Sequence, residues 1–243
     1  MEATYIQGDI HNVIKTFEDN SIDLIYDNPP FATTNQKWDI PLRWEELFKE
    51  MWRVLKPDGV IILHSALPFS YELYRYETPK YNYIWRKRNP TGFFHAKKQP
   101  LRDIEEINVY YKKSHTYNPQ MIGNKKHTEK KTTHKKSEYY GERKQIQTVS
   151  SHTGNYPRLY LGDFKRVING GKSIPIEIIN QMILTYSNEN DKILDMTCHN
   201  KYVGSIAINH NRNYIGVDIN EIVDVVVYAN PEIGITTKQS PSI

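Results

Sequence analysis

The chain has 243 residues, of which 38% are hydrophobic and 12% aromatic, enough for one domain with a sizeable core, with or without an insertion. Its single cysteine excludes an intramolecular disulfide framework and favours a reducing compartment, so we expect a cytoplasmic and not a secreted protein. The sequence shows no apolar stretch of about 18 residues and no signal-peptide pattern, so we expect no membrane span. The formal net charge is only +4, but it is unevenly distributed.

The first third of the chain alternates predicted strands and helices. We expect strands at Tyr5–Ile6, Ile22–Tyr26 and Val60–His64, and helices at Asn12–Phe17, Trp44–Leu55 and Tyr71–Tyr76. The helix over Trp44–Leu55 is amphipathic, because Leu47, Met51 and Leu55 recur at a spacing of four residues. Pro57-Asp58-Gly59 then ends it.

The middle of the chain is less regular. Tyr83–Trp85 and Ile107–Tyr111 are predicted to be an antiparallel edge pair. Residues 113–171 lack sustained periodicity and are rich in Lys, Thr, His, Ser and Gly. So long an irregular segment within a compact domain is usually functional or disordered, and we predict an irregular basic insertion here.

The last third returns to alternating elements. We expect helices at Ile176–Tyr186, Val203–Asn209 and Glu221–Tyr228, and strands at Lys192–Leu194 and Tyr214–Val217. Such alternation predicts an α/β fold with a doubly wound, mainly parallel sheet and an antiparallel edge pair. We predict a single domain over residues 1–230, which includes the insertion, and a loose tail over 231–243.

Asn28-Pro29-Pro30-Phe31 is the most informative motif, because it follows the predicted buried strand Ile22–Tyr26. Open α/β sheets place their chemistry at strand ends. The prolines fix φ and remove two backbone donors, which leaves the Asn28 and Pro29 carbonyls and the Asn28 amide oxygen as acceptors. Beside them, Phe31 offers a flat ring on which a planar ligand can stack. A plain Pro-Pro turn that closes a strand is the alternative.

The motif and its context resemble the β-type DNA amino-methyltransferases, which methylate adenine N6 or cytosine N4. The resemblance covers about Tyr5 to Ile219 and places the catalytic tetrapeptide before the cofactor loop. The segments that carry it are Tyr5–Asp9, Asp19–Ile25, Lys37–Asp39, Trp52–Leu63, Thr91–Lys98, Pro100–Arg102, Pro175–Ile179, Ser187–Asp195 and Asn213–Asp218. It implies a Rossmann-like methyltransferase fold, S-adenosylmethionine as cofactor and DNA as substrate.

The family's chemistry assigns the tetrapeptide Asn28–Phe31 to the target base. Asn28 Oδ1 and the Pro29 carbonyl would hold the two amine hydrogens, and a flipped-out base would stack on Phe31. Asparagine at the first position favours adenine over cytosine. Methylation of cytosine C5 would need a nucleophilic cysteine, typically after a proline, but Cys198 follows Thr197.

The resemblance also implies a cofactor site, formed by residues near the ends of predicted strands. Asp218 would bind the ribose, Asp195 would lie near the methionine portion, and Asp9 near the cofactor adenine. Thr197, His199 and Pro175 stand at further cofactor positions. For each aspartate, a helix N-cap after a strand is the structural alternative.

Two residues depart from the family pattern in the cofactor loop. His199 and Lys201 stand where the family carries the glycines of a Gly-Ser-Gly-type loop, and those glycines permit positive φ and close backbone approach to a ligand. The family segment that precedes the helix is also altered, because Gly170–Pro175 keeps only its last proline. Either the loop has a different geometry, or cofactor binding is weak or absent.

Basic residues indicate the DNA contacts. Residues 124–144 hold eight Lys or Arg and two His against three Glu, which is typical of a polyanion contact or of a solvated loop. We expect Lys125, Lys126, Lys130, Lys131, Lys135 and Lys136 to contact phosphates, with His95, Lys97 and Lys98 nearer the target base. The nine histidines show no zinc spacing, so we expect no metal site.

The sequence thus predicts a site-specific DNA methyltransferase that acts on adenine N6 of double-stranded DNA. The alternative is a catalytically inactive, methyltransferase-like protein that binds DNA or serves as partner of an active subunit. The intact Asn28–Phe31 favours the enzyme, whereas His199 and Lys201 favour the alternative. A homodimer and a partner methyltransferase subunit are both open.

Overall fold

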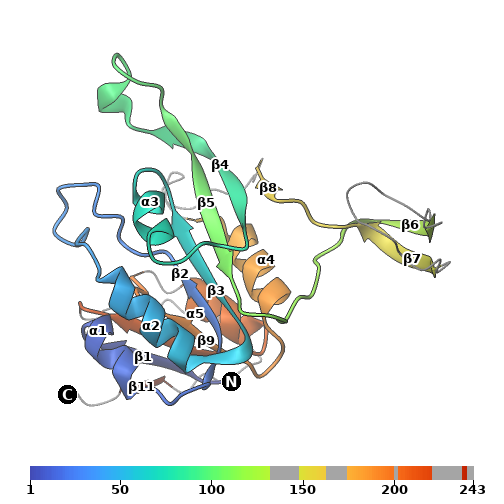
Figure 1. Cartoon of the computed structure of the whole chain (residues 1–243), viewed down its shortest axis with the longest axis horizontal. Helices are drawn as coiled ribbons and strands as arrows, with labels where there is room; N and C mark the ends of the chain where they lie inside the picture. The colour runs from blue at the N-terminus through green and yellow to red at the C-terminus, as the bar shows by residue number, and fades with distance from the viewer. Residues whose placement is uncertain (132–147, 163–173, 200–201, 221–236, 240–243) are drawn as a thin grey trace. The chain divides into compact units, whose positions relative to one another are not determined.

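The computed structural model describes residues 1–131, 148–162, 174–199, 202–220 and 237–239 (Figure 1). They form two compact units. The larger unit combines Met1–Asn118 with Leu159–Ile243, and the smaller one is Pro119–Arg158. No helix in these ranges is long and apolar enough to cross a membrane.

The larger unit is built on a nine-stranded sheet with the order β11-β1-β10-β9-β2-β3-β5-β4-β8. The strands are β1 (Ala3–Gln7), β2 (Ile22–Asp27), β3 (Leu55–Ser65), β4 (Tyr81–Thr91), β5 (Arg102–Tyr110), β8 (Tyr160–Leu161), β9 (Lys192–Asp195), β10 (Asn213–Asp218) and β11 (Thr237–Gln239). Only β5 runs antiparallel to its neighbours, β3 and β4. The predicted fold class is therefore confirmed.

Helices cover both faces of this sheet because the residues of its central strands are apolar on both sides. In β2, Leu24 and Tyr26 belong to one buried core and Ile25 to the other, as the alternation of a strand requires. The first core includes residues of α4 (Ile176–Tyr186) and α5 (Tyr202–Asn209). The second includes residues of α1 (Ile10–Val13), η1 (Ile14–Thr16), α2 (Trp44–Val54) and α3 (Phe69–Tyr74).

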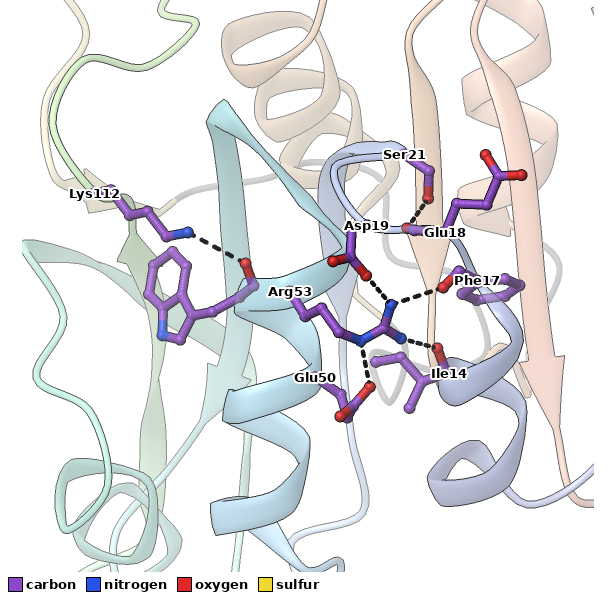
Figure 2. Close-up of polar contacts among 9 residues, drawn as sticks. Ile14, Phe17, Glu18, Asp19, Ser21, Glu50, Arg53 and Lys112 are labelled. Atoms are coloured by element: carbon purple, nitrogen blue, oxygen red, sulfur yellow. Dashed lines mark hydrogen bonds and ion pairs between the residues drawn. The ribbon is translucent and has the colours of Figure 1, made fainter.

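Arg53, in the last turn of α2, ties this helix to the segment that leads into β2 (Figure 2). Its guanidinium donates to the carbonyls of Ile14 and Phe17 at 3.0 and 2.8 Å. It also pairs with Asp19 at 2.6 Å and with Glu50 at 2.7 Å. These contacts hold the segment before β2 against α2. They therefore help to position β2 and Asn28, which directly follows it.

The antiparallel pair β4–β5 is longer than the sequence predicts. The two strands extend to Thr91 and Arg102, and a short turn, η2 (Phe93–His95), connects them. Figure 1 shows this hairpin projecting from the rest of the sheet. Its outer half is polar and exposed, so it lacks the apolar alternation by which strands are predicted.

The smaller unit contains a second hairpin, formed by β6 (Ile122–Lys131) and β7 (Thr148–Asn155). Ordered strands therefore occur within the segment that was predicted to be irregular. The predicted helix Glu221–Tyr228 lies outside the described residues. In the predicted loose tail, Thr237–Gln239 pairs in parallel with β1, and the other tail residues lie outside the description.

Candidate active site

Two segments with candidate functional residues meet where the strand order of the sheet reverses. β2 and β9 are neighbours, but β2 is followed by β3 on one side and β9 by β10 on the other. Ligands of open α/β sheets bind in the crevice outside the carboxyl ends of strands at such a switch point. Asn28 follows the end of β2, and Thr197 follows the end of β9.

Asn28 is exposed at this edge, whereas Pro29 is buried and Pro30 is half-buried. The buried proline anchors the turn, so the Asn28 side chain projects from a fixed backbone. The Asn28 carbonyl lies 3.5 Å from the hydroxyl of Thr197. The first residue of the predicted catalytic motif therefore lies beside the candidate cofactor loop.

Phe31 is half-buried and stacks on Phe69, the first residue of α3. The ring centroids are 4.9 Å apart and the planes differ by 16°. α3 is held in place from β5, because Ser70 and Tyr74 both donate hydrogen bonds to Glu106. One face of the Phe31 ring thus has a partner within the protein, and the ring retains partial exposure.

The loop after the tetrapeptide is organised by Asp39. Its carboxylate accepts from the backbone N–H groups of Ala32, Thr33 and Thr34 at 2.6 to 2.9 Å, and from the Thr34 hydroxyl. Burial acts to raise the pKa of Asp39, but these hydrogen bonds outweigh it, so the net effect lowers the pKa. Asp39 therefore remains ionised and fixes the chain directly beyond Phe31.

Asp27 and Asp195 form a buried acidic pair behind the two loops. Burial raises the pKa of Asp27 to about 6, although hydrogen bonds from Thr197 act in the opposite direction. Burial and then the charge of Asp27 raise the pKa of Asp195 well above its ordinary value, despite a 2.9 Å hydrogen bond from the Tyr214 hydroxyl. Both carboxyls therefore favour the protonated form more than an exposed aspartate does, and they titrate as a pair.

The cofactor-side loop starts from a well-fixed point. The Cys198 N–H donates to the carbonyl of Val217 at 2.9 Å, which joins the loop to the end of β10. Thr197 is half-buried, and His199 is exposed. Lys201 lies outside the described residues.

The three predicted cofactor aspartates have different environments. Asp218 ends β10 and accepts from the N–H of Asn220 at 2.8 Å. Asp9 caps α1, since its side chain accepts from the N–H of His11. Asp195 is 3% exposed and directed toward Asp27 and Tyr214. Asp218 and Asp9 lie close together, because β1 and β10 are paired and end at the same edge.

Pro175 is buried at the start of α4, as the predicted proline position requires. The altered segment before it lies largely outside the described residues, which resume at Ile174. The described residues among those predicted to bind DNA lie on both hairpins. His95, Lys97 and Lys98 are exposed at the end of β4–β5, and Lys125 and Lys126 are exposed on β6.

The other predicted lysines are less fully described. Lys130 and Lys131 belong to β6, whereas Lys135 and Lys136 lie outside the described residues.

Where the chain is described, no group of three His, Cys, Asp or Glu side chains is arranged to hold a metal ion. Three carboxylates that support the segments around Asn28 and Phe31 were not predicted from the sequence: Asp27, Asp39 and Glu106. For Asp27 the sequence did contain an indication, because this carboxylate directly follows the apolar run Ile22–Tyr26.

Comparison with known proteins shows the family of the chain. A family model described as DNA methylase, covering N6 and N4 enzymes, matches residues 22–227. The chain belongs to this family. The predicted resemblance is thereby confirmed, and the methylases of this family depend on S-adenosylmethionine.

Curated relatives of this methylase include methyltransferases from Escherichia coli and Bacillus subtilis. It is 29% identical to the DNA adenine methyltransferase YhdJ of Escherichia coli K12, over 89% of this chain and 78% of that protein. It is 26% identical to the type II methyltransferase M.BglII of Bacillus subtilis, over 90% of this chain and 66% of that protein.

Solved structures confirm the fold of the methylase. The PvuII DNA methyltransferase, described as cytosine-N4-specific, superposes with a TM-score of 0.61 at 12% identity and covers 90% of this chain and 83% of its own. The complex of M1.HpyAVI with S-adenosylmethionine superposes with a TM-score of 0.56 at 15% identity, over 90% and 93% of the two chains. At such identities the superpositions establish the architecture alone.

Proposed function

We propose that this methylase transfers a methyl group from S-adenosylmethionine to N6 of an adenine that is flipped out of double-stranded DNA. The observation that carries the proposal is the placement of exposed Asn28 beside Thr197, at the switch point between β2 and β9. This juxtaposition would bring a nucleobase amine and a cofactor to the same edge of the sheet.

Asn28 and Pro29 would orient the amine. The lone pair of adenine N6 is delocalised into the ring, and acceptors at Asn28 Oδ1 and the Pro29 carbonyl would hold the two hydrogens so that the lone pair localises on nitrogen. The cofactor supplies an electrophilic methyl on a sulfonium. Nitrogen would accept that methyl with release of S-adenosylhomocysteine, and the amine would lose one proton to solvent. Orientation and electrostatics are the protein's contributions.

Phe31 would contact the flipped base. Its stacking on Phe69 fixes the plane of the ring, which lowers the entropic cost of stacking a base against it. Asp39 holds the loop on the other side of Phe31 and so preserves this orientation. Base extrusion is required because N6 is not reachable within a duplex.

The cofactor would lie over the ends of β9, β10 and β1. We assign Thr197 and His199 to the loop that contacts it, Asp218 to the ribose and Asp9 to the adenine, with Pro175 setting the start of α4. Exposed His199 and the paired ends of β1 and β10 fit such a ligand. Asp195, buried behind the loop, would act near the methionine portion by holding the loop and not by direct contact.

We propose residues 1–230 as a single methyltransferase domain with 113–171 as its DNA-contacting insertion. Lysines on phosphates contribute affinity without sequence information. The exposed Lys125 and Lys126 support this assignment, as does the exposure of His95, Lys97 and Lys98 on the other hairpin.

Mass spectrometry of nucleosides tests the proposal directly. The protein is produced in cells that lack DNA methyltransferases, and their DNA is digested to nucleosides. We expect N6-methyladenine. N4-methylcytosine would instead overturn the adenine assignment, and the absence of both would favour the non-catalytic DNA-binding alternative.

A further inference from the structure

The end of the β4–β5 hairpin presents two large aromatic side chains to solvent. We define the hairpin tip as residues 88–102. Within it, Phe94 is 100% exposed and Phe93 is 78% exposed. Full exposure of an aromatic ring is unfavourable for the free protein, so neighbouring exposed rings mark a surface that contacts a partner.

The tip is an ordered turn and not a loose loop. The N–H of His95 donates to the carbonyl of Gly92 at 2.9 Å, and that of Ala96 donates to Phe93 at 3.0 Å. Gly92 has φ of +89°, a left-handed conformation that suits glycine and starts the turn. Phe94 therefore projects from the middle of a backbone that is already folded, which lowers the entropic cost of inserting it into a partner.

Charge identifies the chemistry of that partner. The tip contains no acidic residue, and the first one after it, Asp103, pairs with Arg86 at 3.2 Å. The basic side chains of the tip are all exposed: Arg88, His95, Lys97, Lys98 and Arg102. Exposed rings surrounded by uncompensated positive charge are suited to a partner that combines phosphates with flat apolar groups, which is a nucleic acid.

The register of the sheet places the tip on the catalytic side. Glu106 of β5 lies opposite Ser65, the last residue of β3. From Glu106, β5 continues four residues to Arg102, which carries the hairpin about 13 Å past the end of β3. The carboxyl ends of β2 and β3 are adjacent, so the tip extends from the edge that carries Asn28.

We infer that Phe94, with Phe93 beside it, enters duplex DNA as a wedge between base pairs while the basic residues of the tip hold the flanking phosphates. The inference rests on the proposed function, since extrusion of a base leaves a gap in the stack that an inserted ring would fill. Apolar side chains that enter base steps unstack them and kink the duplex. The wedge would thus stabilise the opened duplex while the base occupies the site at Asn28.

The topology of plasmid DNA tests the wedge without cofactor, methyl transfer or knowledge of the recognition sequence. Closed circular DNA saturated with the protein is relaxed with a topoisomerase, and the linking number is measured after the protein is removed. Insertion of a ring between base pairs lowers the twist of the duplex. The unsubstituted parent protein should therefore lower the linking number of the plasmid. We expect Phe94→Ala to abolish this change and Phe94→Trp to retain it.

Ile104→Ala is the matched control, because Ile104 is also a large apolar side chain of this hairpin and is 52% exposed, but lies outside the tip. It should behave as the parent does. The inference is overturned if the parent leaves the linking number unchanged, or if Phe94→Ala changes it as much as the parent.

Methylation rates give a second, independent result. Phe94→Ala should methylate duplex DNA at least about tenfold more slowly, which corresponds to a barrier higher by about 1.4 kcal/mol. It should methylate single strands as the parent does. Equal losses on both substrates would contradict the wedge. A parent that lowers the linking number but methylates nothing would keep the wedge and overturn the proposed enzyme.

Discussion

Thr197 donates both its backbone N–H and its hydroxyl to the same oxygen of Asp27, at 3.0 and 2.8 Å. These two hydrogen bonds join the end of β9 to the end of β2, although the residues are 170 positions apart. Asp27 directly precedes Asn28, and Thr197 directly precedes the loop of Cys198 and His199. A displacement of the loop after β9 is therefore transmitted to the backbone of Asn28, which we propose to orient the target base.

Asn28→Ala should reduce methyl transfer to below a tenth of the parent rate. The substitution removes the side-chain acceptor of the tetrapeptide, whereas Asn28 is exposed and contributes little to the core. Nucleoside mass spectrometry measures the rate, and DNA affinity should remain within about twofold, since phosphate contacts dominate affinity. Asn12→Ala, at an exposed position of α1, is the control. Activity above a tenth of the parent would remove Asn28 from the catalytic role.

The free energy of unfolding of Asp27→Asn, relative to that of the parent, should increase as the pH rises from 4 to 7. The pKa of Asp27 is raised to about 6, so the native state favours the protonated carboxyl. Stability from that proton is fully present below the unfolded-state pKa near 4 and is lost as the pH passes through 6. The amide mimics the neutral form and avoids the loss, which is on the order of 1–3 kcal/mol.

Urea unfolding of the parent and Asp27→Asn at pH 4.5 and 7.5 measures this difference. Glu45→Gln, at an exposed position of α2, controls for the change in net charge. A free-energy difference between parent and Asp27→Asn that does not change with pH would show that burial does not raise the pKa of Asp27.

Replacing Lys125 and Lys126 together by alanine should weaken DNA binding and flatten its dependence on salt. Each phosphate contact releases counterions, so the loss of two contacts should reduce the slope of log affinity against log salt by about 2. Lys15→Ala with Lys49→Ala removes the same charge from exposed helical positions and serves as control. An unchanged slope would identify β6 as a solvated strand without a DNA contact.

Replacing His199 and Lys201 together by glycine should lower the affinity for S-adenosylmethionine several-fold. We propose that the natural loop is a working variant, and glycine adds about 0.5–1 kcal/mol of conformational entropy cost per residue when the loop is ordered. Calorimetry measures the affinity. The matched change of both residues to alanine separates the loss of the side chains from the added flexibility. A gain in affinity with glycine would instead show that the natural loop is degenerate.

Apolar patterning predicted the elements that pack into the two cores. The helix Trp44–Val54 and the strand Ile22–Asp27 appear within one residue of their expected bounds, because burial imposes their periodicity. The length of the β4–β5 hairpin was underestimated, and the β6–β7 hairpin was not predicted. Their exposed strands are held by backbone ladders, which leave no hydrophobic signature in the side chains.

The position of Asn28 could be predicted from the sequence, but the contacts that support it could not. A proline-containing turn after an apolar run is visible in the sequence, so its position at a strand end could be inferred. The contacts of Asp27 and Asp195 depend on the pairing order of strands that are distant along the chain. Periodicity does not encode that order, so the contacts of Asp195 with Asp27 and Tyr214 could not be predicted from the sequence.

The burial of Cys198 allows the segment after β9 to be followed by a chemical reaction of its thiol. The thiol is buried, 2% exposed, and lies 2.8 Å from where a Cβ on Gly216 would be, so any larger residue at 216 would displace it. Burial also raises the pKa of the thiol, which suppresses the reactive thiolate. Because this is the sole cysteine of the chain, alkylation by an added reagent reports the exposure of this one position, directly after β9. Its rate with and without a ligand would therefore measure how far the ligand protects that position, with no label introduced.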